Sequence, residues 1–370
     1  MAKKIAIVLQ TPRDQHSSVL LTYSALSAEL MRRGHAVSVF TPEDFPGARR
    51  FPGRLAPFVY PIAVARWMRR HRAAVDTVVF HSYAGWLAEA TGATGDAVVI
   101  VSFHGIEPMY HRALMMETSG RLSRRYRFLQ ERVMPMFLKT ACRKAARVTC
   151  LNREERRFLI DNGYADANHV VTVAHSVHDR FFLALRSPRP VRTLLFVAQW
   201  LPIKGIDALR TAFTALARRH ADLRLICAGT LAAAADVTAA FPDDVRERVM
   251  VVPRVDQPRL ADIYRDADLF VFPSSYEGFG VAVLEAMAAA LPIVATATGV
   301  AGDALVDRES AMLVPPRDAA AIVHAIDALI ADAGLRARVS AGARAAAEAY
   351  REAARVGEWA DALTVINRVS

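Results

Sequence analysis

The chain has 370 residues, of which 53% are hydrophobic and 23% charged, so it is long enough for two ordinary domains that each bury a core. Its 47 Lys and Arg outnumber its 37 Asp and Glu, and this balance favours anionic partners such as phosphates or acidic lipid headgroups. Three cysteines without a CxxC pair argue against a disulfide-stapled secreted protein and against structural zinc. Because no apolar tract has the length and composition of a signal peptide or a bilayer span, we expect a globular cytoplasmic protein.

Short β-branched runs alternate with longer helical patterns along the whole chain. A first series of runs lies at residues 5–9, 36–40, 77–81, 97–103, 147–151 and 170–173. A second series lies at residues 193–197, 223–229, 249–252, 269–273, 293–296 and 311–314. Apolar runs of this length are typical of parallel strands that are buried on both faces. The fold class predicted is α/β, with two doubly wound Rossmann-like domains.

Two prolines in residues 186–192 separate the two series, because proline belongs neither to a central strand nor to a helix interior. We therefore expect an N-terminal domain over residues 1–186 and a C-terminal domain over residues 187–349. Apolar side chains at helical spacing predict a last helix, assigned to residues 350–370 and expected to cross back onto the N-terminal domain. These side chains are Tyr350, Val356, Trp359, Leu363 and Ile366. Doubly wound sheets bind ligands beyond the carboxyl ends of their strands, so the chemistry is expected in a cleft between the domains.

Residues 273–287 read PSSYEGFGVAVLEAM, in which a strand ends, a glycine-containing loop follows and an apolar helix begins near Val281. The glycines let the backbone approach a ligand, while free amides and the helix dipole favour phosphate. Glu277 stands before the helix and Glu285 just inside it. Because a carboxylate only accepts hydrogen bonds, Glu285 suits a ribose diol and Glu277 a hydroxyl of a second sugar. A tight turn with two solvated glutamates is the alternative interpretation.

This segment resembles the Glu-x7-Glu signature of the retaining glycosyltransferases of the glycosyltransferase-B fold, family 4, and the resemblance extends from Asp268 to Pro316. It implies two such domains facing across a cleft. It also implies that Glu285 contacts the ribose of a nucleoside diphosphate sugar and that Glu277, as a catalytic residue, contacts the transferred sugar. The other donor-binding residues that it implies here are Gly278, Phe279, Gly280 and Val281.

Residues 196–205, FVAQWLPIKG, are similar to the family's Gly-Arg stretch that ends in Lys-Gly. Lys204 matches the family's lysine, which the resemblance makes a catalytic and donor-binding residue that neutralises the leaving diphosphate without a metal ion. Gln199 stands at the donor-binding position where the family has arginine, so one formal positive charge is missing. This departure keeps open the alternative of a catalytically degenerate sugar-nucleotide-binding or scaffold protein.

In the N-terminal half, residues 102–107, SFHGIE, resemble the family's His-Gly loop and make His104 a catalytic candidate. The first strand-to-helix turn lacks the glycines of many relatives and supplies three acceptor-side candidates, Arg13, His16 and Ser17. His175 and His178 are too isolated a pair to indicate a metal site. We expect neither a metal nor another cofactor, since the nucleoside diphosphate sugar is a substrate.

Residues 121–147 interleave basic and apolar side chains, and a second basic cluster surrounds Trp67 and Met68. The basic residues are Arg121, Arg124, Arg125, Arg127, Arg132, Lys139, Arg143, Lys144 and Arg147, with Arg66, Arg69, Arg70 and Arg72 in the second cluster. Basic amphipathic helices bind anionic headgroups, whereas a solvated helical face is the default alternative. The sequence therefore leaves open peripheral contact with an anionic membrane at its cytoplasmic face.

These observations predict a retaining hexosyltransferase that moves a sugar from a nucleoside diphosphate donor to a hydroxyl of a glycan or lipid-linked acceptor, in bacterial-type polysaccharide or glycolipid synthesis. A sugar-nucleotide epimerase is a second enzymatic alternative. The sequence lacks a GxGxxG after its first strand, a GxSxG elbow and a Walker loop, which disfavours a dehydrogenase, a hydrolase and a P-loop enzyme. No nucleic-acid-binding module is recognisable, so nucleic acid is not an expected partner.

Overall fold

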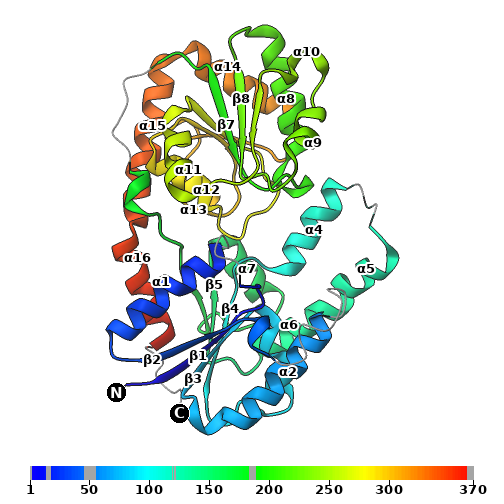
Figure 1. Ribbon diagram of the computed structural model, residues 1–370, viewed down its shortest axis with the longest axis vertical. Helices are drawn as coiled ribbons and strands as arrows, with labels where there is room; N and C mark the ends of the chain where they lie inside the picture. Colours follow the sequence, from blue (N-terminus) through cyan, green and yellow to red (C-terminus); the bar gives the residue numbers. More distant parts are fainter. Residues whose placement is uncertain are drawn as a thin grey trace. The chain divides into compact units, whose positions relative to one another are not determined.

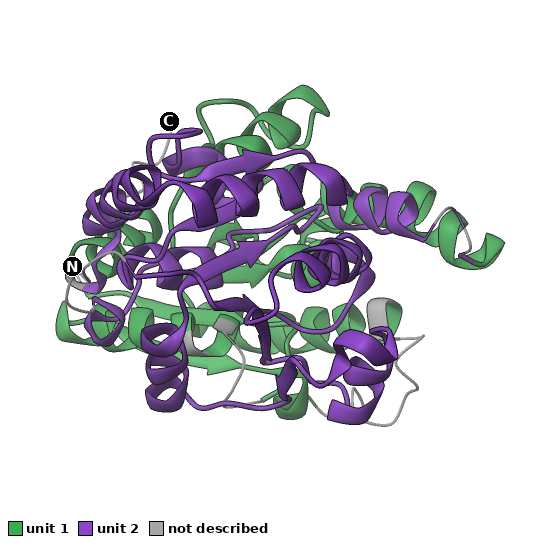
Figure 2. Cartoon of the chain, turned by 90° about the horizontal axis from the view of Figure 1, so that it is seen from above, with its two compact units in different colours: residues 1–108, 123–175, 353–370 green, residues 109–122, 176–352 purple. Residues whose placement is uncertain are grey.

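The computed structural model describes residues 2–13, 18–45, 56–118, 120, 122–182 and 189–364 (Figure 1). The chain divides into two compact units, coloured separately in Figure 2. The first unit comprises Met1–Pro108, Ser123–His175 and Ala353–Ser370, and the second comprises Met109–Leu122 and Ser176–Glu352. The domain boundary expected between residues 186 and 187 lies outside the described residues.

The sheet of the first unit has six parallel strands in the order β2-β1-β3-β4-β5-β6. The strands are β1 (Lys4–Val8), β2 (Ala36–Phe40), β3 (Thr77–His81), β4 (Val98–Ser102), β5 (Arg147–Cys150) and β6 (Val170–Thr172). Ile5 of β1 pairs with Val37 on one side and with Thr77 on the other, which places β1 inside the sheet. This is a doubly wound order.

The sheet of the second unit also has six parallel strands, in the order β12-β11-β10-β7-β8-β9. The strands are β7 (Thr193–Val197), β8 (Arg224–Ala228), β9 (Val249–Val252), β10 (Leu269–Phe272), β11 (Ile293–Thr296) and β12 (Met312–Val314). Connections run outward in both directions from the central pair β7 and β10, which is the Rossmann order. All twelve predicted strands are confirmed, with each end within one residue of its predicted position.

Helices flank both sheets. In the first unit they are α1 (Ser18–Arg32), α2 (Ala56–His71), α3 (Trp86–Ala90), α5 (Arg124–Phe128), α6 (Met134–Cys142), α7 (Arg153–Asp161) and α16 (Glu352–Thr364). In the second they are α8 (Ile206–Arg219), α9 (Ala234–Ala239), α10 (Asp243–Arg246), α11 (Gln257–Asp266), α12 (Val281–Ala288), α13 (Val300–Ala304), α14 (Ala319–Ala331) and α15 (Ala333–Ala347), while α4 (Glu107–Glu117) starts in the first unit and continues in the second. Within the described parts of the chain, every helix is too short or too polar to pass through a bilayer.

Apolar spacing explains how the second unit builds its core. Leu209, Phe213 and Leu216 of α8 recur three or four residues apart, which places them on one face of the helix. This face packs on alternate residues of the strands, including Leu194 and Phe196 of β7. Burial of these side chains fixes the central strands, and with them the loops that follow the strands.

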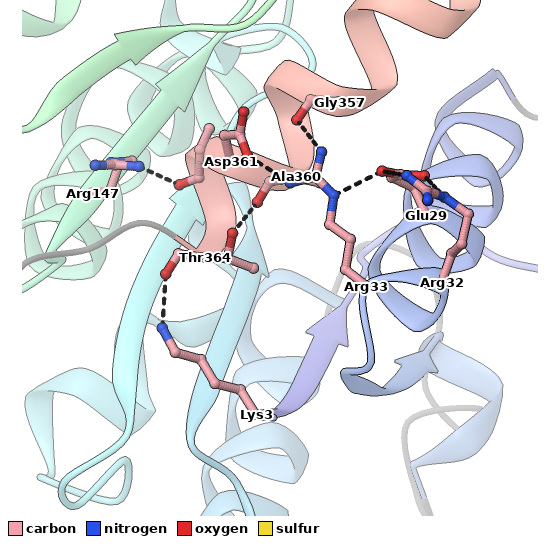
Figure 3. Close-up of polar contacts among 10 residues, drawn as sticks. Lys3, Glu29, Arg32, Arg33, Arg147, Gly357, Ala360, Asp361 and Thr364 are labelled. Atoms are coloured by element: carbon pink, nitrogen blue, oxygen red, sulfur yellow. Dashed lines mark hydrogen bonds and ion pairs between the residues drawn. The ribbon is translucent and has the colours of Figure 1, made fainter. Parts of the chain in front are cut away.

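The last described helix, α16, belongs to the first unit from Ala353 onward and is held there by basic side chains (Figure 3). Lys3 Nζ donates to the carbonyl oxygen of Thr364 at 2.8 Å, and Arg147 donates to that of Ala362 at 2.6 Å. Both carbonyls belong to the last turn, whose carbonyl groups have no N–H donor within the helix and attract positive charge. Arg33 adds an ion pair with Asp361 and a hydrogen bond to the Gly357 carbonyl. Together these contacts anchor α16 on the first unit.

This helix begins later than the sequence pattern indicates. The predicted apolar row starts at Tyr350, whereas α16 starts at Glu352. The reason is a short parallel bridge between Val177 and Arg351, in which the Val177 amide donates to the Tyr350 carbonyl at 2.9 Å. Arg351 is consequently extended, with φ −59° and ψ 144°. Ile366 lies outside the described residues.

Trp359 is the main apolar anchor of α16. Its side chain is buried, and its indole Nε1 donates to the Ala174 carbonyl at 2.8 Å. Its ring also contacts the rings of Tyr23, His104 and His175. An aromatic side chain placed in this way buries a large area while keeping its one polar atom bonded.

We predict that Trp359→Ala lowers the free energy of unfolding by about 3 to 5 kcal/mol, because it removes this packing and leaves a cavity. Met31→Ala on the exposed face of α1, where the side chain is 53% exposed, is the matched control and should cost less than about 0.5 kcal/mol. Denaturant titration followed by far-UV circular dichroism measures both variants. Equal losses in the two variants would contradict the anchoring role of Trp359.

Candidate active site

The switch point between β7 and β10 brings together two predicted site residues that are far apart in the sequence. Lys204 ends the short helical turn Pro202–Lys204 after β7, and Glu277 lies in the loop after β10. Because the two strands are neighbours, the two loops emerge side by side, and Lys204 Nζ lies 2.7 Å from Glu277 Oε1. The Lys204 side chain remains 22% exposed, whereas that of Glu277 is 9% exposed.

A left-handed glycine allows this close approach. Gly205 has φ +70°, and a Cβ added there would overlap the carbonyl oxygen of Pro273. Ser274 and Ser275 bind the same turn, since the Ser275 amide and the Ser274 hydroxyl both donate to the Ile203 carbonyl. The loops that carry Lys204 and Glu277 are therefore packed directly on each other.

The loop between β10 and α12 ends at Gly280, whose φ of +89° places it in the left-handed region immediately before α12. Val281 opens the helix and is half-buried, so the first amides of α12 follow a tight glycine turn. Behind the loop, the Val300 amide donates to the Phe279 carbonyl at 2.7 Å. Gly299 has φ +54°, and a Cβ there would come within 3.0 Å of the Glu277 Cβ. The first amides of α12 are therefore placed as in an anion-binding site, and the loop before them is packed against Gly299 and Val300.

Glu285 lies in α12 and is buried, with 5% of its surface exposed. The Tyr264 hydroxyl lies 3.0 Å from its Oε2 and 2.9 Å from the Ala282 carbonyl oxygen. Burial raises the pKa of Glu285 to about 8, and burial likewise raises the pKa of Tyr264 well above its ordinary value. A carboxyl group held in this way is largely protonated at neutral pH, so in the unliganded chain Glu285 is not the acceptor-only carboxylate expected from the sequence. Tyr264 was not anticipated, because no local pattern links α11 to α12.

The other predicted donor-side residues occupy varied environments. Gln199 is exposed, and its backbone carbonyl accepts a hydrogen bond from the Leu201 amide at 2.8 Å. Gly278 is half-buried, whereas Phe279 is buried with its ring 6.1 Å from that of Tyr350. A contact that the sequence did not indicate joins α4 to this loop, because the Ser275 hydroxyl donates to Glu117 Oε1.

In the first unit, His104 follows β4 and lies in a cluster of aromatic rings. The ring centroids of His175 and Tyr23 are each 5.0 Å from that of His104, and that of His81 is 5.3 Å away. Burial lowers the pKa of His81 and of His175 to about 4, and lowers that of His104 well below its ordinary value. At neutral pH all three imidazoles are therefore uncharged. Neither ring nitrogen of His104 has a hydrogen-bond partner among the described residues.

Of the acceptor-side candidates, Arg13 forms an ion pair with Asp44 at 2.9 Å, and His16 and Ser17 lie outside the described residues. His175 Nδ1 lies 3.1 Å from the Thr22 hydroxyl, and His178 bonds to Arg180. Across the described ranges, no three His, Cys, Asp or Glu side chains gather closely enough to hold a metal ion.

We predict that Gly205→Ala destabilises the protein by about 1 to 3 kcal/mol more than Gly229→Ala, because only the first adds an atom in occupied space. Gly229 is the matched control, since its φ of +68° is almost that of Gly205 but a Cβ there would meet nothing within 4 Å. Urea unfolding curves measure the difference. Identical midpoints would show that the Lys204 turn and the Pro273 loop are not tightly packed.

We also predict a pH-dependent stability that Glu285→Gln removes. The Glu285 pKa is about 8 in the folded chain and 4.5 ordinarily, so between these values the folded chain keeps a proton that the unfolded chain releases. The parent's free energy of unfolding should therefore fall, relative to Glu285→Gln, as pH rises from 5 to 8, with a slope approaching about 1.4 kcal/mol per pH unit. Glu309 is exposed, so Glu309→Gln is the control for the loss of one negative charge. A pH-independent difference between parent and Glu285→Gln would contradict the buried protonated carboxyl group.

Comparison with known proteins assigns both halves of the chain. Residues 22–181 match the family Glycosyltransferase Family 4, and residues 191–332 match the family Glycosyl transferases group 1. The D-inositol 3-phosphate glycosyltransferase of Kineococcus radiotolerans is 29% identical over 88% of this chain and 84% of its own. That of Xylanimonas cellulosilytica is 36% identical over 48% of this chain, but the match spans only 42% of the Xylanimonas enzyme.

Solved structures share the fold. Sucrose-phosphate synthase from Thermosynechococcus elongatus superimposes with a TM-score of 0.77 at 18% identity, over 96% of this chain and 97% of that one. HepE of Anabaena, solved in complex with UDP, gives a TM-score of 0.71 at 17% identity, over 98% and 99% of the two chains. The two family matches both describe glycosyltransferases, and the strand orders and solved structures agree with a fold of two Rossmann-like units. The chain belongs to the family 4 glycosyltransferases (glycosyl transferases group 1), with the glycosyltransferase-B fold.

Proposed function

We propose that this chain transfers a hexose, with retention of configuration, from a nucleoside diphosphate sugar to a hydroxyl of a glycan or lipid-linked acceptor in bacterial-type polysaccharide or glycolipid synthesis. The observation that carries the proposal is the Lys204–Glu277 ion pair of 2.7 Å at the β7/β10 switch point. It sets a cation and a carboxylate side by side, next to the amides that open α12. This combination suits a diphosphate bonded to a sugar, because one group binds the anion while the other accepts from a hydroxyl.

We assign the donor to the second unit residue by residue. The diphosphate lies against Lys204 and the backbone of Gly280 and Val281, where the helix dipole favours negative charge. Glu285 binds the ribose diol, and Tyr264 orients its carboxyl group through the 3.0 Å hydrogen bond. Gly278 and Phe279 border the sugar, and Gln199 occupies the place of the missing cation.

The proposed chemistry needs neither a protein nucleophile nor a metal ion. The bond between the anomeric carbon and the phosphate oxygen breaks, and the leaving diphosphate keeps the electron pair while Lys204 stabilises its charge. The acceptor oxygen bonds to the anomeric carbon on the same face, and its proton passes to the departing phosphate oxygen. The phosphate thus serves as the base.

On the acceptor side we assign His104 the task of contacting a hydroxyl. The lowered pKa keeps its imidazole neutral, so that one ring nitrogen can donate a hydrogen bond and the other can accept. Arg13, His16 and Ser17 remain proposed acceptor-side residues, with the Arg13 guanidinium held by Asp44.

The names of related proteins indicate which substrates to test first. HepE was solved with UDP and UDP-glucose, and the two curated relatives are named for D-inositol 3-phosphate. We therefore give priority to UDP sugars as donors and to polyol phosphates beside lipid-linked glycans as acceptors. The three cysteines are free thiols, which accords with the proposed cytoplasmic location.

A thermal-shift screen of UDP, GDP and ADP sugars tests donor binding, because a ligand of the native state raises its apparent stability. Incubation of the stabilising donor with candidate acceptors, followed by NMR of the glycosidic product, tests transfer and retention. Release of a changed sugar nucleotide without an acceptor would establish an epimerase instead. A folded protein that binds no sugar nucleotide would establish a scaffold.

We predict that Lys204→Ala lowers kcat by about 10²-fold or more, because it removes the charge that stabilises the leaving group. Arg219→Ala is the matched control, since it breaks a 2.6 Å ion pair with Asp327 at the opposite end of α8. That control should leave kcat within twofold of the parent. Steady-state release of nucleoside diphosphate measures both, and an unchanged kcat in Lys204→Ala would refute the assigned role.

A further inference from the structure

Glu285 is a buried acid of the second unit, and no cation among the described residues forms an ion pair with it. Burial and the Tyr264 hydroxyl are the influences on its protonation. Glu277, the other buried acid of the site, differs because Lys204 Nζ lies 2.7 Å from it. An ionised carboxylate that is buried without a cation is so unfavourable that the neutral form is preferred. In the unliganded chain Glu285 therefore carries a hydrogen.

The hydrogen-bond geometry of Tyr264 agrees with a neutral Glu285. The phenol oxygen lies 2.9 Å from the Ala282 carbonyl oxygen and 3.0 Å from Glu285 Oε2, at the contact between α11 and α12 (Figure 1). A phenol has one hydroxyl hydrogen, and a backbone carbonyl can only accept. When Tyr264 donates to Ala282, its contact with Glu285 is a full hydrogen bond only if the carboxyl group donates. The geometry thus has a place for the hydrogen, on Oε2 and directed at Tyr264.

The same hydroxyl is also placed to stabilise an ionised Glu285. Rotation about the bond between the ring and the oxygen of Tyr264 turns the hydrogen from Ala282 to Glu285 Oε2, and no heavy atom has to move. Ala282 lies within α12, where the helical pattern gives its carbonyl the Ala286 amide as a donor. A hydrogen bond from Tyr264 lowers the pKa of Glu285, against the larger effect of burial. Tyr264 can therefore accept from the neutral acid and donate to the ionised one.

Packing holds the Tyr264 ring in the position that both roles require. The side chain is buried, with the Phe181 ring edge-on at 5.7 Å and the Phe270 ring at 5.9 Å. Burial also raises the pKa of Tyr264 well above its ordinary value, so the phenol keeps its own proton. The orientation of the hydroxyl hydrogen is what remains free to change.

Other charged groups near α12 do not set the protonation of Glu285. Arg344 of α15 donates to the Ala288 carbonyl at the far end of α12, and Arg336 donates to carbonyls of α14. Strand β11 carries no charged residue, and the two charged side chains of the turn Asp179–Phe181 are exposed. The charged side chains of α11, α13 and α15 that are at least partly buried are Asp262, Asp303, Arg336 and Arg344. None of these is among the influences on Glu285, so its proton depends on burial and Tyr264.

We propose that binding of the nucleoside diphosphate sugar releases one proton from Glu285, with Tyr264 as the positioning residue that stabilises the ionised form. Two ribose hydroxyls donate to Glu285, and a carboxylate accepts both, whereas a protonated carboxyl group has one strong acceptor oxygen. The inference rests on the proposed function, because it concerns the ribose of the same donor.

The exchange is balanced in atoms and charge. The O–H bond of the Glu285 carboxyl group breaks, the electron pair stays on Oε2, and the proton passes to the solvent buffer. Tyr264 then donates to Oε2, and the ribose hydroxyls supply the remaining hydrogen bonds. The negative diphosphate opposes ionisation of Glu285, and the Lys204 ammonium group and the first amides of α12 offset that effect.

Calorimetry of the full chain with UDP-glucose at pH 7 tests the proposal. The diphosphate of this ligand is esterified at both ends and does not titrate near neutral pH, so the protons counted come from the protein. Titrations in PIPES, HEPES and imidazole give the number released, as the dependence of the observed enthalpy on the ionisation enthalpy of the buffer. The parent should release about 0.9 proton, because an acid of pKa about 8 is about nine-tenths protonated at pH 7. If UDP-glucose does not bind, GDP-glucose and ADP-glucose are titrated in the same way.

The pH dependence of the affinity is a second measurement on the same protein. Because binding releases a proton, the dissociation constant should fall as pH rises from 6 to 7.5, approaching about tenfold per pH unit. Glu285→Gln cannot lose a proton, so it should release none and bind with an affinity that does not vary over this range.

Tyr264→Phe keeps the ring but removes the hydroxyl. It should release less than about half a proton at pH 7 and bind about tenfold more weakly, because the ionised carboxylate loses a charge-assisted hydrogen bond. Tyr60→Phe is the matched control, since Tyr60 is a buried tyrosine of the first unit whose hydroxyl donates to the Leu9 carbonyl at 2.5 Å. That control should match the parent in proton release and in affinity.

The outcomes separate this inference from the proposed function. Binding by the parent without proton release, or equal release by Glu285→Gln, would overturn the inference and leave the proposed function intact. Release and affinity in Tyr264→Phe equal to those of Tyr60→Phe would overturn the role of Tyr264. A folded parent that binds none of the three sugar nucleotides would refute both the proposed function and the inference that rests on it.

Discussion

The site of the second unit depends on the neighbouring positions of β7 and β10. The chain runs outward from this pair in both directions, so no helix crosses between the ends of the two strands, and their loops meet. Gly205 lets the first loop approach the Pro273 carbonyl, and the ion pair between Lys204 and Glu277 forms across the contact. Residues 73 positions apart thereby become one charged site, next to the amides that start α12. The chemistry that we propose requires this juxtaposition.

Burial sets the protonation state of several polar groups in the unliganded protein. Glu285 holds a proton at neutral pH because its carboxyl group is buried, and Tyr264 fixes its direction. In the first unit, burial keeps His104 and its neighbouring imidazoles uncharged, while Trp359 of α16 closes the cluster. Polar groups held in this way cost stability, which the packed strands and helices of each unit offset. In both units, these polar groups are held in place by apolar residues that take no part in the proposed chemistry.

The sequence was sufficient for the parts that depend on local pattern. Twelve apolar runs predicted the strands, and the segment from Pro273 to Glu285 predicted a helix start with two carboxylates. Contacts between distant segments left no such signal. Tyr264 bonds to Glu285 from another helix, and Glu117 of α4 accepts a hydrogen bond from Ser275. The bridge between Val177 and Arg351 makes the last helix begin later than the apolar pattern predicts. Each of these depends on packing that periodicity does not encode.

A crystal structure of the chain with a nucleoside diphosphate tests the central claim most directly. The account predicts diphosphate oxygens within 3.2 Å of Lys204 Nζ and of the first amides of α12, with both ribose hydroxyls on the Glu285 carboxyl group. A nucleotide bound elsewhere, or one bound there with its ribose turned away from Glu285, would contradict it.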